Sequence, residues 1–354
     1  MRMGLIEITM DLGAAGYDIL LGSGCLDRAG ELLHLDRKVL IVTDTGVPAA
    51  WAGAVASACR EAEIVRIPQG EDSKNFDQFR LLMQRMLAFG MGRGDCVAAV
   101  GGGVVGDLSG FAAACYMRGI DFYNIPTTVL SQVDSSIGGK TAIDLDGVKN
   151  IVGAFYQPRR VLVDPRTLST LPRRQVANGL AEAVKMALCF DAEGFARFEA
   201  LDPGRMYAAL AAGEPVPELE RIIADALRTK KRVVEQDEKE QGLRRVLNFG
   251  HTLGHGIESL HAENGLLHGE CVALGMLPMC APAVRDRLLP VLEKLGLPVT
   301  CGADPGRVME AVLHDKKMYA GKARAIFVEQ VGAFTERELT PGELRSLYTG
   351  YFFS

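Results

Sequence analysis

The stretch "AVGGGVVGD" (99–107) places three consecutive glycines between an apolar run and a segment that favours helix. Within it, Gly101, Gly103 and Gly106 have the Gly-x-Gly-x-x-Gly spacing of a turn that binds the pyrophosphate of a dinucleotide. Glycine lets the backbone approach the phosphate, and the N-terminus of the next helix supplies N–H donors. A tight strand–helix turn without a ligand would explain the same residues, so the turn alone leaves both interpretations open.

The segments around this turn alternate between strand and helix patterns. Apolar, β-rich runs occupy residues 38–44, 63–68, 96–100, 122–126 and 160–164, and helical patterns occupy residues 47–62, 75–91 and 108–117. This alternation predicts a mostly parallel sheet with helices on both faces, in a Rossmann-like α/β domain. After Pro172 helical patterns dominate, apart from a late strand candidate at 323–330. We therefore predict an α/β domain over 1–172 and a mainly α-helical domain over 173–354.

The composition excludes several classes of protein. The 354 residues carry a net charge of −5, which argues against a general binder of nucleic acid or of anionic membranes. The longest uncharged apolar run, 272–284, is too short to span a bilayer and contains two prolines. The N-terminal residues lack a signal-peptide pattern, and the eight cysteines form no Cys-x-x-Cys pair. We expect a cytoplasmic protein with no nucleic-acid or membrane partner.

Further residues fit a dinucleotide at the edge of the predicted sheet. Asp44 ends the run 38–44, and a carboxylate at the carboxyl end of a strand can bind two ribose hydroxyls. Glu71 and Lys74 lie on another loop that we place at the same edge. As isolated charges they would be ordinary solvated side chains. The glycine turn lies mid-domain, which is not an ordinary Rossmann order.

The helical half contains a possible metal site. His251 and His255 are four residues apart and share one face of a helix, while His268 lies on a separate segment. Glu182 sits in the apolar helix "GLAEAVKMAL" and would be costly to bury unpaired. Either metal binding or an ion pair with Lys185 would remove that cost, and the histidines could equally be core or capping residues. A catalytic zinc site usually has three protein ligands and an open position, which two histidines and a glutamate would provide.

Glycines 250, 254 and 256 crowd the same histidine-bearing helix. Each costs about 1 kcal/mol relative to alanine in a helix interior. Close approach of a ligand or of a neighbouring backbone would explain them.

The sequence "SSIGGKT" (135–141) ends like a nucleotide-triphosphate P-loop. A P-loop needs glycine six positions before its lysine, but Asp134 occupies that position and would repel a phosphate. We therefore reject an ATPase and interpret Lys140 as an anion-binding residue. It shares this basic character with Arg118, Lys149, Lys230, Arg244 and Lys316. Each alone would be a surface charge, but together they suggest a small, acidic, phosphorylated substrate.

Several longer motifs resemble one family. The segments "GGGVVGDLSGFAAACYMRG", "NIPTTVLSQVDSSIGGKTAID", "KNIVGAFYQP", "GLAEAVK", "LNFGHTLGH" and "LHGE" closely resemble 3-dehydroquinate synthases, over nearly the whole chain. The resemblance implies a homodimer of two-domain subunits that use NAD and Zn²⁺ or Co²⁺. It implies conversion of 3-deoxy-D-arabino-heptulosonate 7-phosphate to 3-dehydroquinate and phosphate in the shikimate pathway. The steps would be transient oxidation by NAD, phosphate β-elimination, reduction, ring opening and intramolecular aldol closure.

The resemblance also implies roles for individual residues. The metal ligands would be Glu182, His251 and His268. The substrate would contact Arg118, Asp134, Lys140, Lys185, Lys230, Arg244, Asn248, His255 and Lys316. NAD would contact Asp44, Glu71, Lys74, Gly102, Gly103, Asp107, Thr127, Thr128, Lys149, Asn150 and Thr170. This chain departs from the family at Gln175, where a glutamate is usual.

Three alternatives share part of this pattern. Another NAD- and metal-dependent sugar-phosphate cyclase would keep the cofactor motifs and differ in the substrate residues, and Lys230, Arg244 and Asn248 together favour a carboxylated substrate. A metal-dependent polyol dehydrogenase would share the glycine turn and the histidines but would release NADH. A non-catalytic NAD or metal sensor would not need the full set of candidate catalytic groups.

Overall fold

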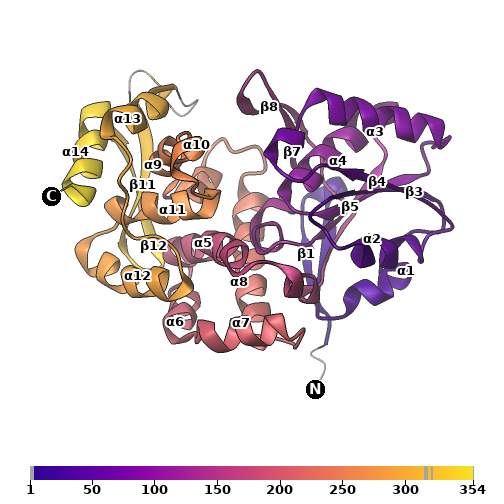
Figure 1. Cartoon of the computed structure of the whole chain (residues 1–354), viewed down its shortest axis with the longest axis horizontal. Coiled ribbons are helices and arrows are strands. Elements are labelled where there is room, and N and C mark those ends of the chain that lie inside the picture. The colour runs from indigo at the N-terminus through magenta and orange to yellow at the C-terminus, as the bar shows by residue number, and fades with distance from the viewer. Residues whose placement is uncertain (1–3, 315–317, 320–321, 354) are drawn as a thin grey trace. The chain divides into compact units, whose positions relative to one another are not determined.

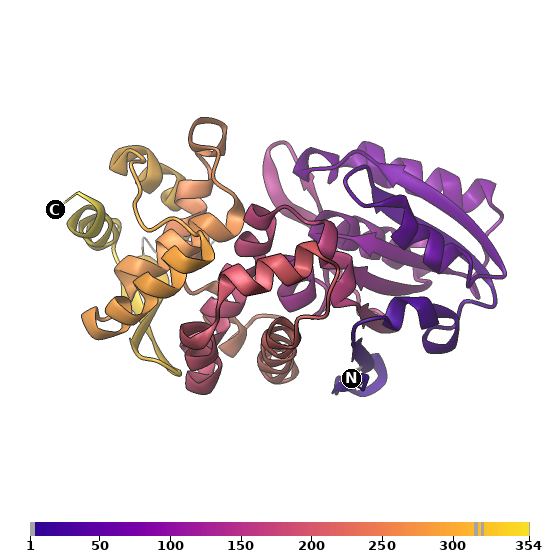
Figure 2. The same cartoon turned by 60° about the horizontal axis from the view of Figure 1, so that its bottom comes forward.

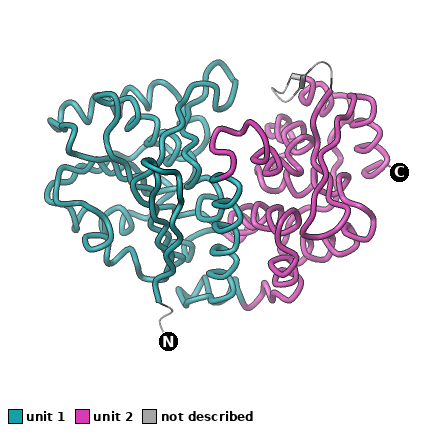
Figure 3. Tube along the Cα trace, turned by 180° about the vertical axis from the view of Figure 1, so that it is seen from behind, with its two compact units in different colours: residues 1–171, 206–235 teal, residues 172–205, 236–354 magenta. Residues whose placement is uncertain are grey.

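The computed structural model describes residues 4–314, 318–319 and 322–353. The chain forms two compact units, the first made of residues 1–171 and 206–235 and the second of residues 172–205 and 236–354 (Figure 3). Residues 206–235 thus group with the first unit, whereas the predicted boundary at 172 places them with the helical half. Among the described residues, none of the helices is both long enough and apolar enough to cross a membrane.

The first unit is built on a seven-stranded sheet (Figure 1). Its strands are β1 (Ile6–Met10), β2 (Tyr17–Leu21), β3 (Lys38–Asp44), β4 (Glu61–Ile67), β5 (Cys96–Gly101), β6 (Asp121–Pro126) and β9 (Arg160–Val163). The spatial order is β1-β2-β9-β6-β5-β3-β4, and every neighbouring pair is parallel except β1 and β2. The predicted mostly parallel sheet is therefore confirmed, and the antiparallel β1–β2 pair is an addition that the sequence analysis does not include.

Helices cover both faces of this sheet, because successive residues of a strand point to opposite sides. The helices of the first unit are α1 (Ala29–Leu32), α2 (Ala49–Ala56), α3 (Phe76–Ala88), α4 (Gly103–Cys115) and, ending at its boundary, α8 (Pro217–Gln236); α7 (Pro203–Ala211) begins just before residue 206. Leu40 and Val42 pack in one core with residues of α3 and α4, and Val39 and Ile41 pack in a second core with residues of α1 and α2. The helix predicted over 47–62 is shorter, since residues 61–67 pair with β3 as a strand.

The order of the parallel strands fixes where a ligand can bind. From β3 onward the chain order gives β4-β3-β5-β6-β9, which is the doubly wound order with its reversal between β3 and β5. Ligands of such sheets bind outside the carboxyl ends of the strands at that reversal. Asp44 ends β3 and Gly101 ends β5, so both predicted cofactor elements lie at this point. The topology thus explains why the glycine turn lies mid-domain.

Lys140 begins a strand. It is the first residue of β7 (Lys140–Leu145), which pairs with β8 (Val148–Phe155) in an antiparallel hairpin that the sequence analysis does not predict. A P-loop lysine precedes a helix, so the structure agrees with the rejection of that motif.

Asp121, at the start of β6, forms ion pairs whose contribution to the stability of the first unit depends on pH. Its carboxylate lies 2.8 Å from Arg37 Nη1 and 2.6 Å from Arg159 Nε. Burial opposes ionisation, but the hydrogen bonds from the two arginines outweigh it and lower the pKa of Asp121 below its ordinary value of 3.8. Since folding lowers this pKa, the stabilisation is complete above pH 3.8 and is lost as the pH falls further.

We therefore expect Asp121→Asn to lower the free energy of unfolding by about 1.5–3 kcal/mol at neutral pH, because hydrogen bonds to a charged group are removed. The deficit should shrink below pH 4, as measured by urea unfolding at several pH values. Asp77→Asn, which breaks an exposed pair with Arg80, should change little at any pH. A deficit that stays constant down to the acid transition would contradict the assignment.

The second unit is mainly α-helical, as predicted, and its helices after residue 260 are the orange and yellow segments of Figure 2. Its helices are α5 (Arg173–Phe190), α6 (Ala192–Ala200), α9 (His251–Glu258), α10 (His261–Asn264), α11 (His268–Met276), α12 (Pro282–Leu295), α13 (Pro305–His314) and α14 (Pro341–Phe352). A three-stranded antiparallel sheet joins β10 (Met318–Tyr319), β11 (Lys322–Gln330) and β12 (Ala333–Leu339). The predicted late strand corresponds to β11, and helices α5, α9 and α11 carry the histidines and the glutamate of interest.

Candidate active site

Helix α5 places a charged pair in the core of the second unit. Its residues from Val176 to Cys189 are all buried, and these include Glu182 and Lys185. One turn apart, the two side chains form an ion pair between Lys185 Nζ and Glu182 Oε2. Burial alone would raise the pKa of Glu182, but the neighbouring Lys185 and His268 lower it to about 2. The carboxylate is therefore ionised, as a metal ligand must be.

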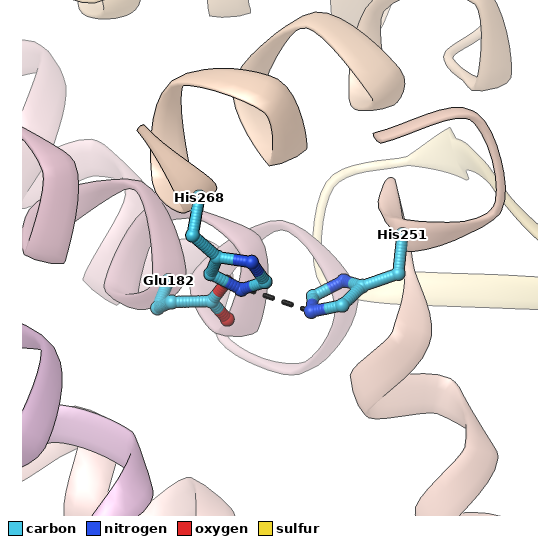
Figure 4. Close-up of side chains that lie close together, drawn as sticks. All are labelled: Glu182, His251 and His268. Atoms are coloured by element: carbon cyan, nitrogen blue, oxygen red, sulfur yellow. Dashed lines mark ion pairs between the residues drawn. The ribbon is translucent and has the colours of Figure 1, made fainter. Parts of the chain in front are cut away.

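Two histidines face this carboxylate. Glu182 Oε1 lies 3.6 Å from His251 Nε2 and 3.4 Å from His268 Nε2, and Figure 4 shows the three side chains pointing toward one another. These separations exceed a good hydrogen bond. They match the spacing of about 3.3–3.4 Å between two ligand atoms on a tetrahedral zinc ion with bonds of about 2.0–2.1 Å. The three donor groups thus fit a divalent cation.

The hydrogen bonding of the Glu182 carboxylate also fits a cation at this position. Glu182 Oε1 has no hydrogen-bond partner within the described part of the chain, although the side chain is completely buried. An ionised, buried carboxylate without hydrogen bonds is costly, and Lys185 offsets that cost only at one oxygen. A cation between Glu182, His251 and His268 would satisfy the other.

Close packing of backbones brings the three helices together. At the α5–α11 crossing, Asn178 Oδ1 accepts a hydrogen bond of 2.6 Å from Gly269 N, and a Cβ at Gly269 would lie 1.9 Å from Asn178 O. At the α9–α11 crossing, a Cβ at Gly275 would lie 1.9 Å from Gly250 O, and one at Gly254 would lie 3.0 Å from Cys271 O. The expected reason for glycines 250 and 254, a close approach of a neighbouring backbone, is therefore found at α11.

The structure brings two predicted substrate residues to this cluster, and two more lie on the segment that precedes α9 in the chain. His255 joins the cluster, with its ring centroid 5.2 Å from that of His251, and Lys185 contacts Glu182. Arg244 and Asn248 belong to the 3₁₀ segment η7 (Leu243–Asn248), just before α9. The backbone N–H of Arg244 donates to Asp237 Oδ2 at 2.9 Å, and Asn248 Nδ2 donates to Glu240 Oε1 at 3.0 Å.

In the first unit, four predicted cofactor residues gather at the ends of β5 and β6. Thr127 N donates to Gly101 O at 2.9 Å, and a Cβ at Gly102 would lie 3.2 Å from Thr128 Cγ2. Gly103 begins α4 directly after this turn. The backbone N–H groups of the first helical turn are therefore available to a phosphate.

Lys74 is the centre of a second group of predicted cofactor residues. Its buried Nζ lies 2.6 Å from Asp107 Oδ2 and 3.6 Å from Glu71 Oε1, and it also contacts Asn150 Oδ1. Burial favours the neutral amine, but Asp107 and Glu71 outweigh it and raise the pKa of Lys74. Glu71 and Lys74 share one loop, Asp107 and Asn150 lie on other segments of the sequence, and the fold brings all four together.

The remaining predicted residues are more dispersed. Asp44 Oδ1 accepts hydrogen bonds from Gly46 N at 2.7 Å and Val47 N at 3.1 Å, which fixes the orientation of its carboxylate. Thr170 Oγ1 donates to Thr167 O at 3.5 Å. The residues Arg118, Lys140 and Lys149 are exposed, and Arg118 has a left-handed backbone with φ of 69°. Lys316 lies outside the described residues.

Lys230, on α8, is held by Asp134. Its buried Nζ lies 2.7 Å from Asp134 Oδ1 and 2.6 Å from Asp134 O. A second tie on the same helix is the 2.5 Å hydrogen bond from Ser23 Oγ to Glu220 Oε1. These contacts show why α8, which the sequence analysis places in the helical half, groups with the first unit.

Glu258 is a candidate that the sequence predictions do not include. Its Oε2 lies 2.9 Å from His268 Nδ1. Only its spacing of seven residues from His251, which puts both on one face of α9, could have drawn attention to it.

Comparison with known proteins identifies similar sequences over nearly the whole chain. Residues 64–178 match the family model described as 3-dehydroquinate synthase N-terminal, and residues 179–318 match the one described as 3-dehydroquinate synthase C-terminal. The chain is 41% identical over 357 aligned residues to the 3-dehydroquinate synthase of Pelobacter propionicus, and the alignment covers 96% of this chain and 98% of that protein.

Solved structures with a similar fold contain a dinucleotide and a metal. A 2-deoxy-scyllo-inosose synthase complexed with carbaglucose-6-phosphate, NAD⁺ and Co²⁺ has a TM-score of 0.86 and 26% identity, covering 99% of this chain and all of that one. A 2-epi-5-epi-valiolone synthase from Streptomyces hygroscopicus with NAD⁺ and Zn²⁺ bound has a TM-score of 0.84 and 27% identity, covering 99% of each chain.

Proposed function

Because this chain belongs to the 3-dehydroquinate synthase family, we propose that Glu182, His251 and His268 hold the divalent cation of the synthase reaction. The reaction converts 3-deoxy-D-arabino-heptulosonate 7-phosphate to 3-dehydroquinate and phosphate. The observation that carries the proposal is the convergence of one ionised carboxylate oxygen and two imidazole nitrogens, with the carboxylate oxygen 3.4 and 3.6 Å from the nitrogens.

The cofactors divide between the two units of the chain. The second unit supplies the metal ligands, and the first supplies the glycine turn and Asp44, which we assign to NAD. When bound, the cation supplies Lewis acidity toward adjacent substrate hydroxyls, and NAD supplies a hydride acceptor that is regenerated in each turnover. The metal in the solved relatives is Co²⁺ or Zn²⁺, and we propose Zn²⁺ for this chain because its donor set is one carboxylate and two imidazoles.

The basic side chains are proposed to bind and orient the substrate. Lys185 and Lys230 are buried ammonium groups that carboxylate partners hold in place, so they can bind an anionic substrate with little loss of side-chain freedom. Arg244 is buried, with its backbone anchored to Asp237, and provides a guanidinium suited to a carboxylate or phosphate. Asn248 and His255 add donors and acceptors for hydroxyls. We assign Arg118, Asp134, Lys140 and Lys316 to the same substrate.

The same proposal covers the NAD-binding set beyond the glycine turn. Asp107, Glu71 and Asn150 meet at Lys74, so this cluster offers donors and acceptors close to the first turns of α4. We assign to NAD the full set of Asp44, Glu71, Lys74, Gly102, Gly103, Asp107, Thr127, Thr128, Lys149, Asn150 and Thr170.

The finer classification follows from the chemistry. Loss of phosphate by β-elimination makes the enzyme a phosphorus–oxygen lyase of the shikimate pathway, which leads to chorismate and the aromatic amino acids. We also propose a cytoplasmic homodimer, on the cysteine pattern of the sequence and on the resemblance to the family. Sedimentation of the purified chain tests the dimer.

A phosphate-release assay tests the function. With the heptulosonate phosphate as substrate, we expect equal amounts of phosphate and 3-dehydroquinate, and no net NADH, because the hydride returns to the intermediate within each turnover. Removing NAD or adding a chelator should abolish phosphate release, and Zn²⁺ should restore activity after chelation.

The rival functions give different results in the same assay. Stoichiometric NADH formation would identify a polyol dehydrogenase. Turnover of a sugar phosphate that lacks a carboxylate, with none of the heptulosonate phosphate, would identify another cyclase. We expect that the protein does not hydrolyse ATP and that ATP does not raise its melting temperature, because Asp134 occupies the position where a P-loop requires glycine.

A further inference from the structure

The two histidines of the proposed metal site differ in what holds their other ring nitrogen. His251 Nδ1 lies 3.1 Å from the backbone carbonyl of Phe249, a neutral acceptor. His268 Nδ1 lies 2.9 Å from Oε2 of Glu258, a carboxylate. In both cases an oxygen accepts the Nδ1 proton, which leaves Nε2 directed at Glu182. The arrangement fixes the tautomer that a metal-binding imidazole needs.

Glu258 occupies a position that helix stability does not favour. It is the last residue of α9, where a negative charge opposes the helix dipole, and its side chain is only 17% exposed. Helix α9 therefore carries a proposed metal ligand, His251, in its first turn and this carboxylate in its last. The close α9–α11 crossing at Gly254 and Gly275 brings Glu258 to His268, the first residue of α11.

We propose that Glu258 is a positioning residue for the metal centre: its carboxylate orients His268 through Nδ1 and makes Nε2 a stronger ligand. The inference rests on the proposed metal site. It goes beyond the predicted residues, because Glu258 belongs to neither the ligand set nor the substrate set. A carboxylate bonded to a metal-bound histidine raises the basicity of that ligand, and its loss typically lowers metal affinity about 10–100-fold.

A simpler role also fits the structure. In that role the Glu258–His268 pair stabilises the helix packing and has no effect on the metal. A third role is direct ligation, because one atom each of His255, Glu258 and His268 also lie within 4.8 Å of one another. The three roles predict different metal-binding behaviour and can be separated with zinc alone.

The experiment measures Zn²⁺ affinity of the full chain by competition with a chromophoric chelator, together with the melting temperature of the zinc-free protein. The variants are Glu258→Ala and Glu258→Gln. The matched control is Glu310→Ala, an exposed glutamate on α13, which also packs against α9. Glu258→Ala should weaken zinc binding about 10–100-fold. Glu258→Gln should weaken it less, because the amide oxygen still accepts the Nδ1 proton, and the control should bind as the wild type does.

Imidazole NMR of the zinc-loaded protein adds a reading that does not depend on affinity. The His268 Nδ1–H resonance should move in Glu258→Gln and be lost to exchange in Glu258→Ala, while that of His251 stays in place. A lowered melting temperature with unchanged zinc affinity in both variants would reduce the pair to a packing contact. A loss of bound zinc equivalents, rather than of affinity, would make Glu258 a ligand. Either result overturns the proposal.

The same data distinguish its failure from that of the metal site. If His268→Ala loses zinc while Glu258→Ala and Glu258→Gln bind as the wild type does, the ligands stand and only the positioning role fails. If His268→Ala keeps wild-type affinity, the metal site itself is wrong.

Discussion

Replacing His251 and His268 together with alanine is expected to empty the metal site and to lower turnover by at least about 10³-fold. A Lewis acid supplies several kcal/mol of transition-state stabilisation, and each 1.36 kcal/mol corresponds to about a tenfold change in rate. Metal analysis of the purified double variant should show no bound zinc, and phosphate release should fall to the level of the chelated wild type. Stoichiometric zinc in this variant would refute the assignment of the ligands.

The choice of substitution matters because Glu182, the third proposed ligand, also pairs with Lys185. Glu182→Gln would leave the buried ammonium of Lys185 without its counter-charge, and breaking a buried pair costs about 3–5 kcal/mol. A loss of activity in that variant would therefore mix unfolding with loss of metal. The histidine substitutions avoid this problem. The matched control is His34→Ala, an exposed histidine of the first unit, which should retain both zinc and activity.

Gly275→Ala is expected to lower the free energy of unfolding by about 2 kcal/mol or more, although alanine is the better helix former. The added Cβ would lie 1.9 Å from Gly250 O and 2.8 Å from Gly254 N, so backbone atoms of α9 would have to move. Overpacking of this kind costs about 1–3 kcal/mol, occasionally more, and exceeds the gain of about 1 kcal/mol in helix propensity. Urea unfolding of the zinc-free protein measures the change.

The control is a glycine with room around it. Gly53 lies in α2, and a Cβ there would meet nothing within 4 Å, so Gly53→Ala should leave stability unchanged or raise it by up to about 1 kcal/mol. Gly275→Ala should also weaken zinc binding in whatever fraction folds, since a displaced α9 carries His251 away from Glu182. A stable Gly275→Ala protein with normal zinc affinity would show that the crossing of α9 and α11 adapts without cost.

The elements that the sequence predicted well are those with a local signal. The buried strand 38–44 is a continuous apolar run, and the glycine turn at 101–103 ends one strand and begins one helix. Glu182 drew attention because a charge within an apolar helix needs a partner. In each case the signal lies within about ten residues.

The parts that were missed depend on partners distant in sequence. The hairpin strand β8 is mostly exposed, so it lacks the apolar alternation that marks a strand. The grouping of α8 with the first unit depends on Asp134, which lies 96 residues from Lys230. Glu258 is a candidate only because the packing of α11 against α9 places His268 next to it, and no sequence pattern within α9 predicts that contact.

The chain enters and leaves the first unit more than once, and this has a consequence for how the protein can be divided. A fragment that stops at residue 171 lacks α8 and its buried apolar residues Leu219, Ile223 and Leu227. It also lacks Glu220 and Lys230, the partners of Ser23 and Asp134. The complementary fragment carries α8 without the unit with which it clusters. The two halves are therefore not exchangeable modules: a chimera joined at the apparent midpoint inherits an incomplete sheet domain, whereas one that transplants residues 206–235 along with the first 171 keeps it whole.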